Sequence, residues 1–115
     1  MEPTIGVVHW AFPPVTGGVE MHLLTICPEM VRQGAEVVVL CGSAPGEPAT
    51  EEIKGVTVER RDGMKPARIE EALAEGADIH GSSRRMFKAF LDEHAIDVIQ
   101  AHNLHLDFFD LSRAL

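Results

Sequence analysis

The sequence contains no hydrophobic run long enough for a membrane helix, which needs about 18–20 consecutive apolar residues. Its first residues, Met-Glu-Pro-Thr-Ile, show neither the basic stretch nor the apolar core of a signal peptide. Together these two absences predict a cytoplasmic protein. The 115 residues are 45% hydrophobic and 24% charged, which is typical of a soluble globular chain, and their number limits the chain to one domain.

Basic residues are few. The chain holds 10 Lys and Arg against 18 Asp and Glu, so its net charge is −8, and the carboxylates are scattered along it. Nucleic-acid-binding proteins draw most of their affinity from clustered Lys and Arg. We therefore expect no nucleic-acid partner.

Cysteine occurs only twice. Cys27 falls within an apolar helical pattern and Cys41 at the end of an apolar run, and their spacing fits no zinc motif. In a cytoplasmic protein, two such thiols are more often buried or free than bridged. The sequence thus predicts neither a disulfide nor a metal site.

Short apolar runs alternate with helical patterns along the chain. The runs predict four strands, at residues 5–8, 37–40, 56–59 and 96–101. The helical spacing predicts a helix from residue 19 to a terminating glycine at Gly34, another over 79–94, and a short one within 64–77. Strands that alternate with helices form parallel sheets with right-handed crossovers. We therefore expect an α/β fold, a Rossmann-like doubly wound parallel sheet of about four strands with flanking helices.

Three details refine this expectation. Residues 44–50 are rich in Pro, Gly and Ala and are expected to form a loop. The run at 56–59 alternates apolar and polar residues, which favours a position near the edge of the sheet. Pro28 falls inside the first helix and is expected to bend it, because proline has no N–H group to donate.

In doubly wound sheets, ligands bind beyond the carboxyl ends of the strands, where the strand order reverses. Here that point lies between the first and fourth predicted strands, and the loops at 9–18 and 102–107 open onto it. The candidate site residues in these two loops are His9, Gly17, Gly18, His102, Asn103, His105 and Asp107.

Gly17 and Gly18 directly precede the first helix. Without a Cβ, their backbone can adopt positive φ and let a phosphate oxygen approach the N–H groups. The dipole of the helix also favours an anion at this end. A glycine turn that only leads the chain into its helix would leave the same pattern, so the pair alone does not decide between the two.

Two nucleotide-binding fingerprints are absent, because neither G-x-G-x-x-G nor G-x-x-x-x-G-K-[ST] occurs in the sequence. The second strand ends in Cys41-Gly42-Ser43, without the acidic residue that would hold the ribose of NAD. NAD binding is therefore disfavoured.

Residues 9–22 run His-Trp-Ala-Phe-Pro-Pro-Val-Thr-Gly-Gly-Val-Glu-Met-His. They resemble the opening of the family 4 retaining glycosyltransferases of GT-B fold, in which an aromatic and proline-containing loop ends in Gly-Gly-apolar-Glu and enters the first helix. Residues 31–40 resemble the family's next segment, with Ala35 where histidine is common. Residues 97–103, Asp-Val-Ile-Gln-Ala-His-Asn, are similar to its Asp-apolar-apolar-His-x-His pattern, with Gln100 replacing the first histidine and His102 matching the second. The resemblance spans nearly the whole chain, although residues 44–90 carry no specific motif.

The resemblance implies a chemistry. The family transfers a sugar from a nucleotide-sugar donor with retention of anomeric configuration. Its N-terminal domain mainly receives the acceptor, and its C-terminal domain mainly holds the nucleotide. By position, Gly17 and Gly18 would contact the donor diphosphate, and His102 would lie near the transferred sugar as the catalytic residue. Members are generally metal-independent, with the departing phosphate assisting deprotonation of the acceptor, so no cofactor is expected.

The other polar candidates would line a cleft for an acceptor of unknown identity: His9, Trp10, Asn103, His105 and Asp107. Alternatives remain for some of them. Trp10 would also fit at the sheet edge, and His102 would also fit as a strand-end residue that bonds only a backbone group. A His-x-x-His pair at 102–105 is a weak metal signal. His22 and His80 are expected to be solvated.

The helix at 79–94 carries basic residues beside apolar ones: Arg84, Arg85 and Lys88 with Met86, Phe87 and Phe90. Such a helix can lie on an anionic membrane surface, and some relatives act on lipid-linked acceptors. The preferred interpretation places the aromatic rings in the core and the charges in solvent.

The family's second domain, with its acidic E-x7-E motif, is absent from these residues, and the last residues read as a helix without a glycine stop. Residues 1–115 are therefore expected to form an incomplete N-terminal Rossmann-like domain that is inactive alone. The alternative function is a non-catalytic Rossmann-like binding or interaction module that a partner chain completes. In either case, open sheet edges would invite self-association.

Overall fold

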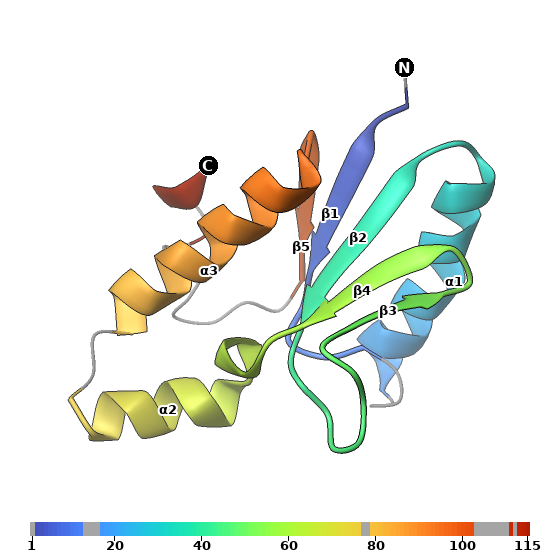
Figure 1. Cartoon of the computed structure of the whole chain (residues 1–115). Helices are drawn as coiled ribbons and strands as arrows, with labels where there is room; N and C mark the ends of the chain where they lie inside the picture. The colour runs from blue at the N-terminus through green and yellow to red at the C-terminus, as the bar shows by residue number, and fades with distance from the viewer. Residues whose placement is uncertain (1, 13–16, 77–78, 103–110, 112) are drawn as a thin grey trace.

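The structure, a computed structural model, describes residues 2–12, 17–76, 79–102, 111 and 113–115. Its strands are β1 (Thr4–Val8), β2 (Glu36–Cys41), β3 (Thr50–Ile53), β4 (Val56–Arg60) and β5 (Val98–Ala101). Its helices are α1 (Gly18–Arg32), α2 (Pro66–Ala74) and α3 (Ile79–His94), with a 3-10 turn η1 (Asp62–Met64) before α2. The strand order is β3-β4-β2-β1-β5, and every neighbouring pair is parallel except β3 and β4 (Figure 1). The predicted α/β class and Rossmann-like doubly wound sheet are confirmed.

Within the described residues, the sheet has one strand more than the sequence predicted. The sequence of β3 is Thr-Glu-Glu-Ile, and its two glutamates are not typical of a strand. The two-residue turn Lys54-Gly55 joins β3 to β4. Both turn residues have positive φ, 51° and 84°, as this tight hairpin turn requires. Glu51 of β3 accepts a 2.7 Å hydrogen bond from the buried side chain of Arg60. The position near an edge that was predicted for residues 56–59 is confirmed, because only β3 lies outside β4 in the order of the described strands.

Helices α1 and α3 cover opposite faces of the sheet (Figure 1). On one face, α1 packs Leu23 and Cys27 against alternate residues of β1, β2 and β4. On the other face, α3 packs Phe87 and Phe90 against β1 and β2. The aromatic rings of α3 thus belong to the core while Lys88 is exposed, which agrees with the preferred interpretation of this helix. No helix in the described part of the chain is long and apolar enough to cross a membrane.

Helix α1 ends where the sequence predicted. Gly34 has φ 105°, its N–H donates to the carbonyl of Val31, and the N–H of Ala35 donates to the carbonyl of Met30. These paired bonds are those of a glycine-terminated helix. The helix is continuous through Pro28, and the bend expected there stays a prediction.

Strand β5 is held against β1 by a reciprocal pair of bonds. The N–H of Thr4 donates to a carboxylate oxygen of Asp97 over 2.8 Å, and the N–H of Asp97 donates to the carbonyl of Thr4 over 2.9 Å. In the order of the described strands β5 lies at an edge, and its Val98 is 54% exposed. Self-association through such an edge stays a prediction.

Candidate functional site

The strand order reverses between β1 and β5, as predicted, and the loops that leave these strands begin side by side. The N–H of His9 donates to the carbonyl of Leu40 at the end of β2, over 3.1 Å. The N–H of His102 donates to the carbonyl of Val8 at the end of β1, over 2.8 Å. The two histidines therefore continue the sheet by one residue each, and they bring the loops after β1 and β5 to the same edge.

Gly17 and Gly18 form the entry to α1. Gly17 is the N-cap with φ 176°, which is ordinary extended backbone, and Gly18 is the first helical residue. Neither glycine has the positive φ that the missing Cβ would allow. What Gly18 provides is space, because a Cβ built on it would meet none of the described atoms within 4 Å. The N-cap makes no side-chain hydrogen bond, and the N–H groups of the first turn have no helical partners.

The imidazole of His9 is buried and lies between His102 and Glu20. Its side chain is 1% exposed, and its Nδ1–H donates to the carbonyl oxygen of His102 over 3.1 Å. Its Nε2 lies 3.5 Å from Oε1 of Glu20. In the described residues this ring has almost no exposed surface, and its role in an acceptor cleft stays a prediction.

Glu20 is the residue that the loop analysis missed. It is 6% exposed, lies in the first turn of α1 and faces His9. A buried carboxylate costs free energy unless it is paired, so its place beside an imidazole marks it as part of the site. The available signal was its position three residues after Gly17, in the Gly-Gly-apolar-Glu motif.

His102 lies directly after β5 and is partly exposed, but its Nε2 is buried and has no hydrogen-bond partner among the described residues. Burial lowers its pKa below the ordinary value of 6.5, and the neighbouring His9 and His22 lower it further. The ring therefore favours its neutral form, in which one nitrogen donates and the other accepts a hydrogen bond. Such a group can contact a hydroxyl without adding charge.

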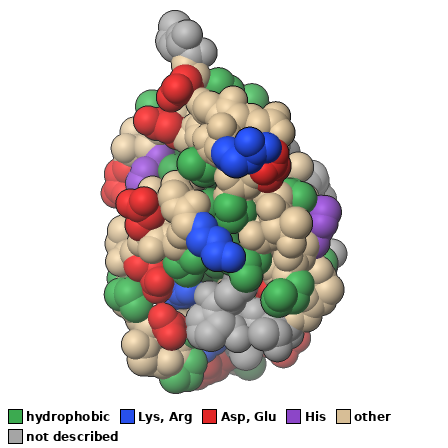
Figure 2. All heavy atoms as spheres, turned by 90° about the vertical axis from the view of Figure 1, so that its right-hand side faces the viewer, with side chains coloured by type: hydrophobic (Ala, Val, Ile, Leu, Met, Phe, Trp, Pro, Cys, Tyr) green, Lys and Arg blue, Asp and Glu red, His purple; other side chains and the backbone are tan. Residues whose placement is uncertain are grey.

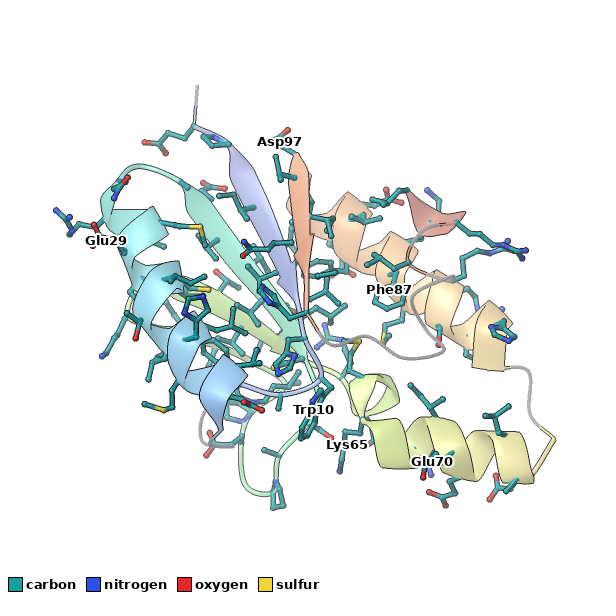
Figure 3. The ribbon with its side chains drawn as sticks, turned by 180° about the vertical axis from the view of Figure 1, so that it is seen from behind. Trp10, Glu29, Lys65, Glu70, Phe87 and Asp97 are labelled. Carbon is teal, nitrogen blue, oxygen red and sulfur yellow. The ribbon has the colours of Figure 1, made fainter. Side chains whose placement is uncertain are left out.

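Trp10 is half-buried, and its carbonyl oxygen accepts a 2.7 Å hydrogen bond from the N–H of Gly42. Figure 3 shows its side chain beside Lys65, at the carboxyl end of the sheet. This position fits both roles predicted for it, lining a cleft and packing at the sheet edge. Asn103, His105 and Asp107 lie outside the described residues. His22 and His80 are exposed, as expected.

The face on the α1 side of the molecule carries scattered carboxylates and isolated Lys and Arg side chains (Figure 2). In the described part of the chain, one group combines metal-binding atoms: Glu59, Glu93 and His94 place one such atom each within 4.8 Å of the others. The guanidinium of Arg61 already bonds Glu59 over 2.5 Å and would compete with a cation. This group lies between β4 and the end of α3, away from the loops described above.

A family model described as Glycosyltransferase Family 4 matches residues 16–115. The match includes Gly17, Gly18, Glu20 and His102, and it begins after His9 and Trp10. No curated protein and no solved structure matches the chain. Because the family model covers most of the sequence, the chain belongs to glycosyltransferase family 4.

Proposed function

We propose that this chain supplies the acceptor side of a retaining glycosyltransferase, which transfers a sugar from a nucleotide-sugar donor. The carrying observation is that the uncapped, open N-terminus of α1 at Gly18 and the partly exposed His102 lie at the same edge of the sheet. One feature suits an anionic diphosphate and the other a neutral sugar hydroxyl. Family membership supports the assignment of both.

In this proposal, the N–H groups of Gly18 and Val19 bind the donor diphosphate. They belong to the first turn of α1, where N–H groups have no helical partner. The dipole of the helix adds to their attraction for the anion. The open space at Gly18 lets phosphate oxygens reach the backbone.

His102 is the proposed catalytic residue beside the transferred sugar. Its lowered pKa keeps the ring neutral at neutral pH, so it positions a sugar hydroxyl by hydrogen bonding and adds no positive charge beside the diphosphate. Trp10 is proposed to border the acceptor cleft, together with Asn103, His105 and Asp107. Catalysis is then mainly positioning and electrostatic stabilisation. The main contacts to the nucleotide come from a second domain outside residues 1–115.

The test is nuclear magnetic resonance of the 115-residue chain, titrated with nucleotide-sugars, nucleoside diphosphates and the matching nucleosides. We expect the amide signals of Gly18, Val19 and His102 to shift with the sugar donor and with the diphosphate, and to stay in place with the nucleoside. The nucleoside is the matched control, because it lacks only the phosphates. Unchanged amide signals with every nucleotide-sugar tried would refute the proposed function.

A further inference from the structure

His9 lies at the meeting point of three strand ends. Its N–H bonds Leu40 at the end of β2, and its Nδ1–H bonds the carbonyl of His102 after β5. A carbonyl oxygen only accepts hydrogen bonds, so the proton of this second bond lies on Nδ1. The ring therefore fixes the backbone that carries His102.

The other ring nitrogen lacks a hydrogen bond. Nε2 of His9 is fully buried, has no hydrogen-bond partner among the described residues, and lies 3.5 Å from the carboxylate of Glu20. With Nδ1 protonated, a neutral ring would present a lone pair to a carboxylate oxygen, and two acceptors repel. A proton between the two atoms turns this contact into a charge-assisted hydrogen bond. The buried carboxylate then has a partner, which removes most of the cost of its burial.

Glu20 also contacts the loop at the start of α1. A Cβ built on Gly17 would lie 2.7 Å from Oε2 of Glu20, so this oxygen lies directly against the glycine backbone. One carboxylate oxygen thus faces His9 and the other faces Gly17. Glu20 joins the Gly17-Gly18 turn to the ring that holds the His102 backbone.

From these contacts we infer that Glu20 is a positioning residue that acts through His9 on the segment carrying His102. The inference rests on the proposed function, since it assigns a role in the same site. The 3.5 Å contact between His9 Nε2 and Glu20 Oε1 completes the link. The other titratable groups near this pair are His102 after β5 and His22 on α1. Of these, the described structure gives only His102 a direct bond to the ring of His9.

The test compares the 115-residue chain with its Glu20→Gln variant by nitrogen-15 resonance of the histidine rings at about pH 6. The ring nitrogen signals of His9 are expected to shift in the variant, because the carboxylate that lies 3.5 Å from Nε2 loses its charge. The backbone amide of His102 is expected to shift with them. Dispersion of the amide signals shows whether the variant is folded, and Glu20→Asp, whose shorter side chain lengthens the gap, is the second variant if it is not.

Glu29→Gln is the matched control. Glu29 lies on the same helix, is exposed at its other end (Figure 3), and bonds Arg32 there, so the variant makes the same charge change far from His9. We expect wild-type signals for His9 and His102 in this control. Unmoved ring signals of His9 and an unmoved His102 amide in Glu20→Gln would overturn the inference. Pyrophosphate is then added to the wild type: no shift at Gly18 counts against the proposed function and leaves the result for the His9–Glu20 pair unchanged.

Discussion

The N–H of Gly42 donates to the carbonyl oxygen of Trp10 over 2.7 Å, and this bond joins the loop after β2 to the loop after β1. A Cβ built on Gly42 would lie 2.6 Å from that oxygen and 2.8 Å from Cγ of Lys65. The backbone of Gly42 does not have positive φ, so its conformation does not demand glycine. Glycine is required here because the carbonyl oxygen of Trp10 and the side chain of Lys65 leave no room for a Cβ. The contact places Trp10 at the rim of the candidate site.

Gly42→Ala should therefore destabilise the fold by about 1–3 kcal/mol, the usual cost of forcing atoms into a filled space. It should also shift the fluorescence of Trp10, the single tryptophan of the chain. Denaturant unfolding followed by fluorescence measures both effects. Gly18→Ala is the control, because its Cβ meets none of the described atoms within 4 Å, so it should neither lower the free energy of unfolding nor move the emission. If Gly42→Ala left the free energy of unfolding and the emission unchanged, the loops after β1 and β2 could move apart without a cost in free energy.

Gly18→Trp is expected to fold normally but to lose diphosphate binding. The new Cβ has room, since none of the described atoms lies within 4 Å of it, and the indole would cover the N–H groups of the first turn. Circular dichroism with a thermal melt tests the fold, and titration with a nucleoside diphosphate tests binding. In a protein that joins this chain to its second domain, transfer activity should be lost as well. Binding equal to that of the wild type would show that the diphosphate does not bind at the N-terminus of α1.

The sequence was enough for those features whose cause is local. The glycine stop at Gly34 and the helical pattern of α3 depend on residues close in the chain, and both were predicted correctly. The family motifs likewise led to Gly17, Gly18 and His102, which the structure brings to one edge.

What could not be predicted depends on contacts between distant residues. β3 forms a strand because it pairs with β4, where Glu51 meets the buried Arg60, although its own residues lack a strand pattern. His9 is buried because His102, which is 93 residues away, and Glu20 close around its ring. Neither partner can be identified from the sequence next to His9.

The two thiols should be unreactive in the native chain. Cys27 and Cys41 are free and buried, as the sequence predicted, and burial raises their pKa values to about 11 and about 12. Since only the thiolate reacts, alkylation by iodoacetamide at about pH 8 should be slow in buffer and rapid in denaturant. Intact mass after timed quenching measures the rate. Rapid labelling of either cysteine in buffer would mean that its side of the core opens on the time scale of the reaction.

His102 should make stability depend on pH in a defined direction. Folding lowers its pKa below 6.5, so between the folded-state pKa and 6.5 the unfolded chain binds more protons than the folded chain. Its contribution to stability is therefore fully present above pH 6.5 and is lost as the pH falls toward the folded-state pKa. The His102→Ala variant lacks this pH-dependent contribution. When the pH is lowered from about 7.5 to about 5.5, its free energy of unfolding should therefore fall by less than that of the wild type.

Urea unfolding of the wild type and of His102→Ala at several pH values measures this difference. Transfer activity gives an independent reading in a protein that joins this chain to its second domain, where His102→Ala should abolish transfer even at a pH at which its stability equals that of the wild type. If His102→Ala instead kept full activity and changed only the pH dependence of stability, His102 would be a structural strand-end residue, and the catalytic group would lie elsewhere on the same edge.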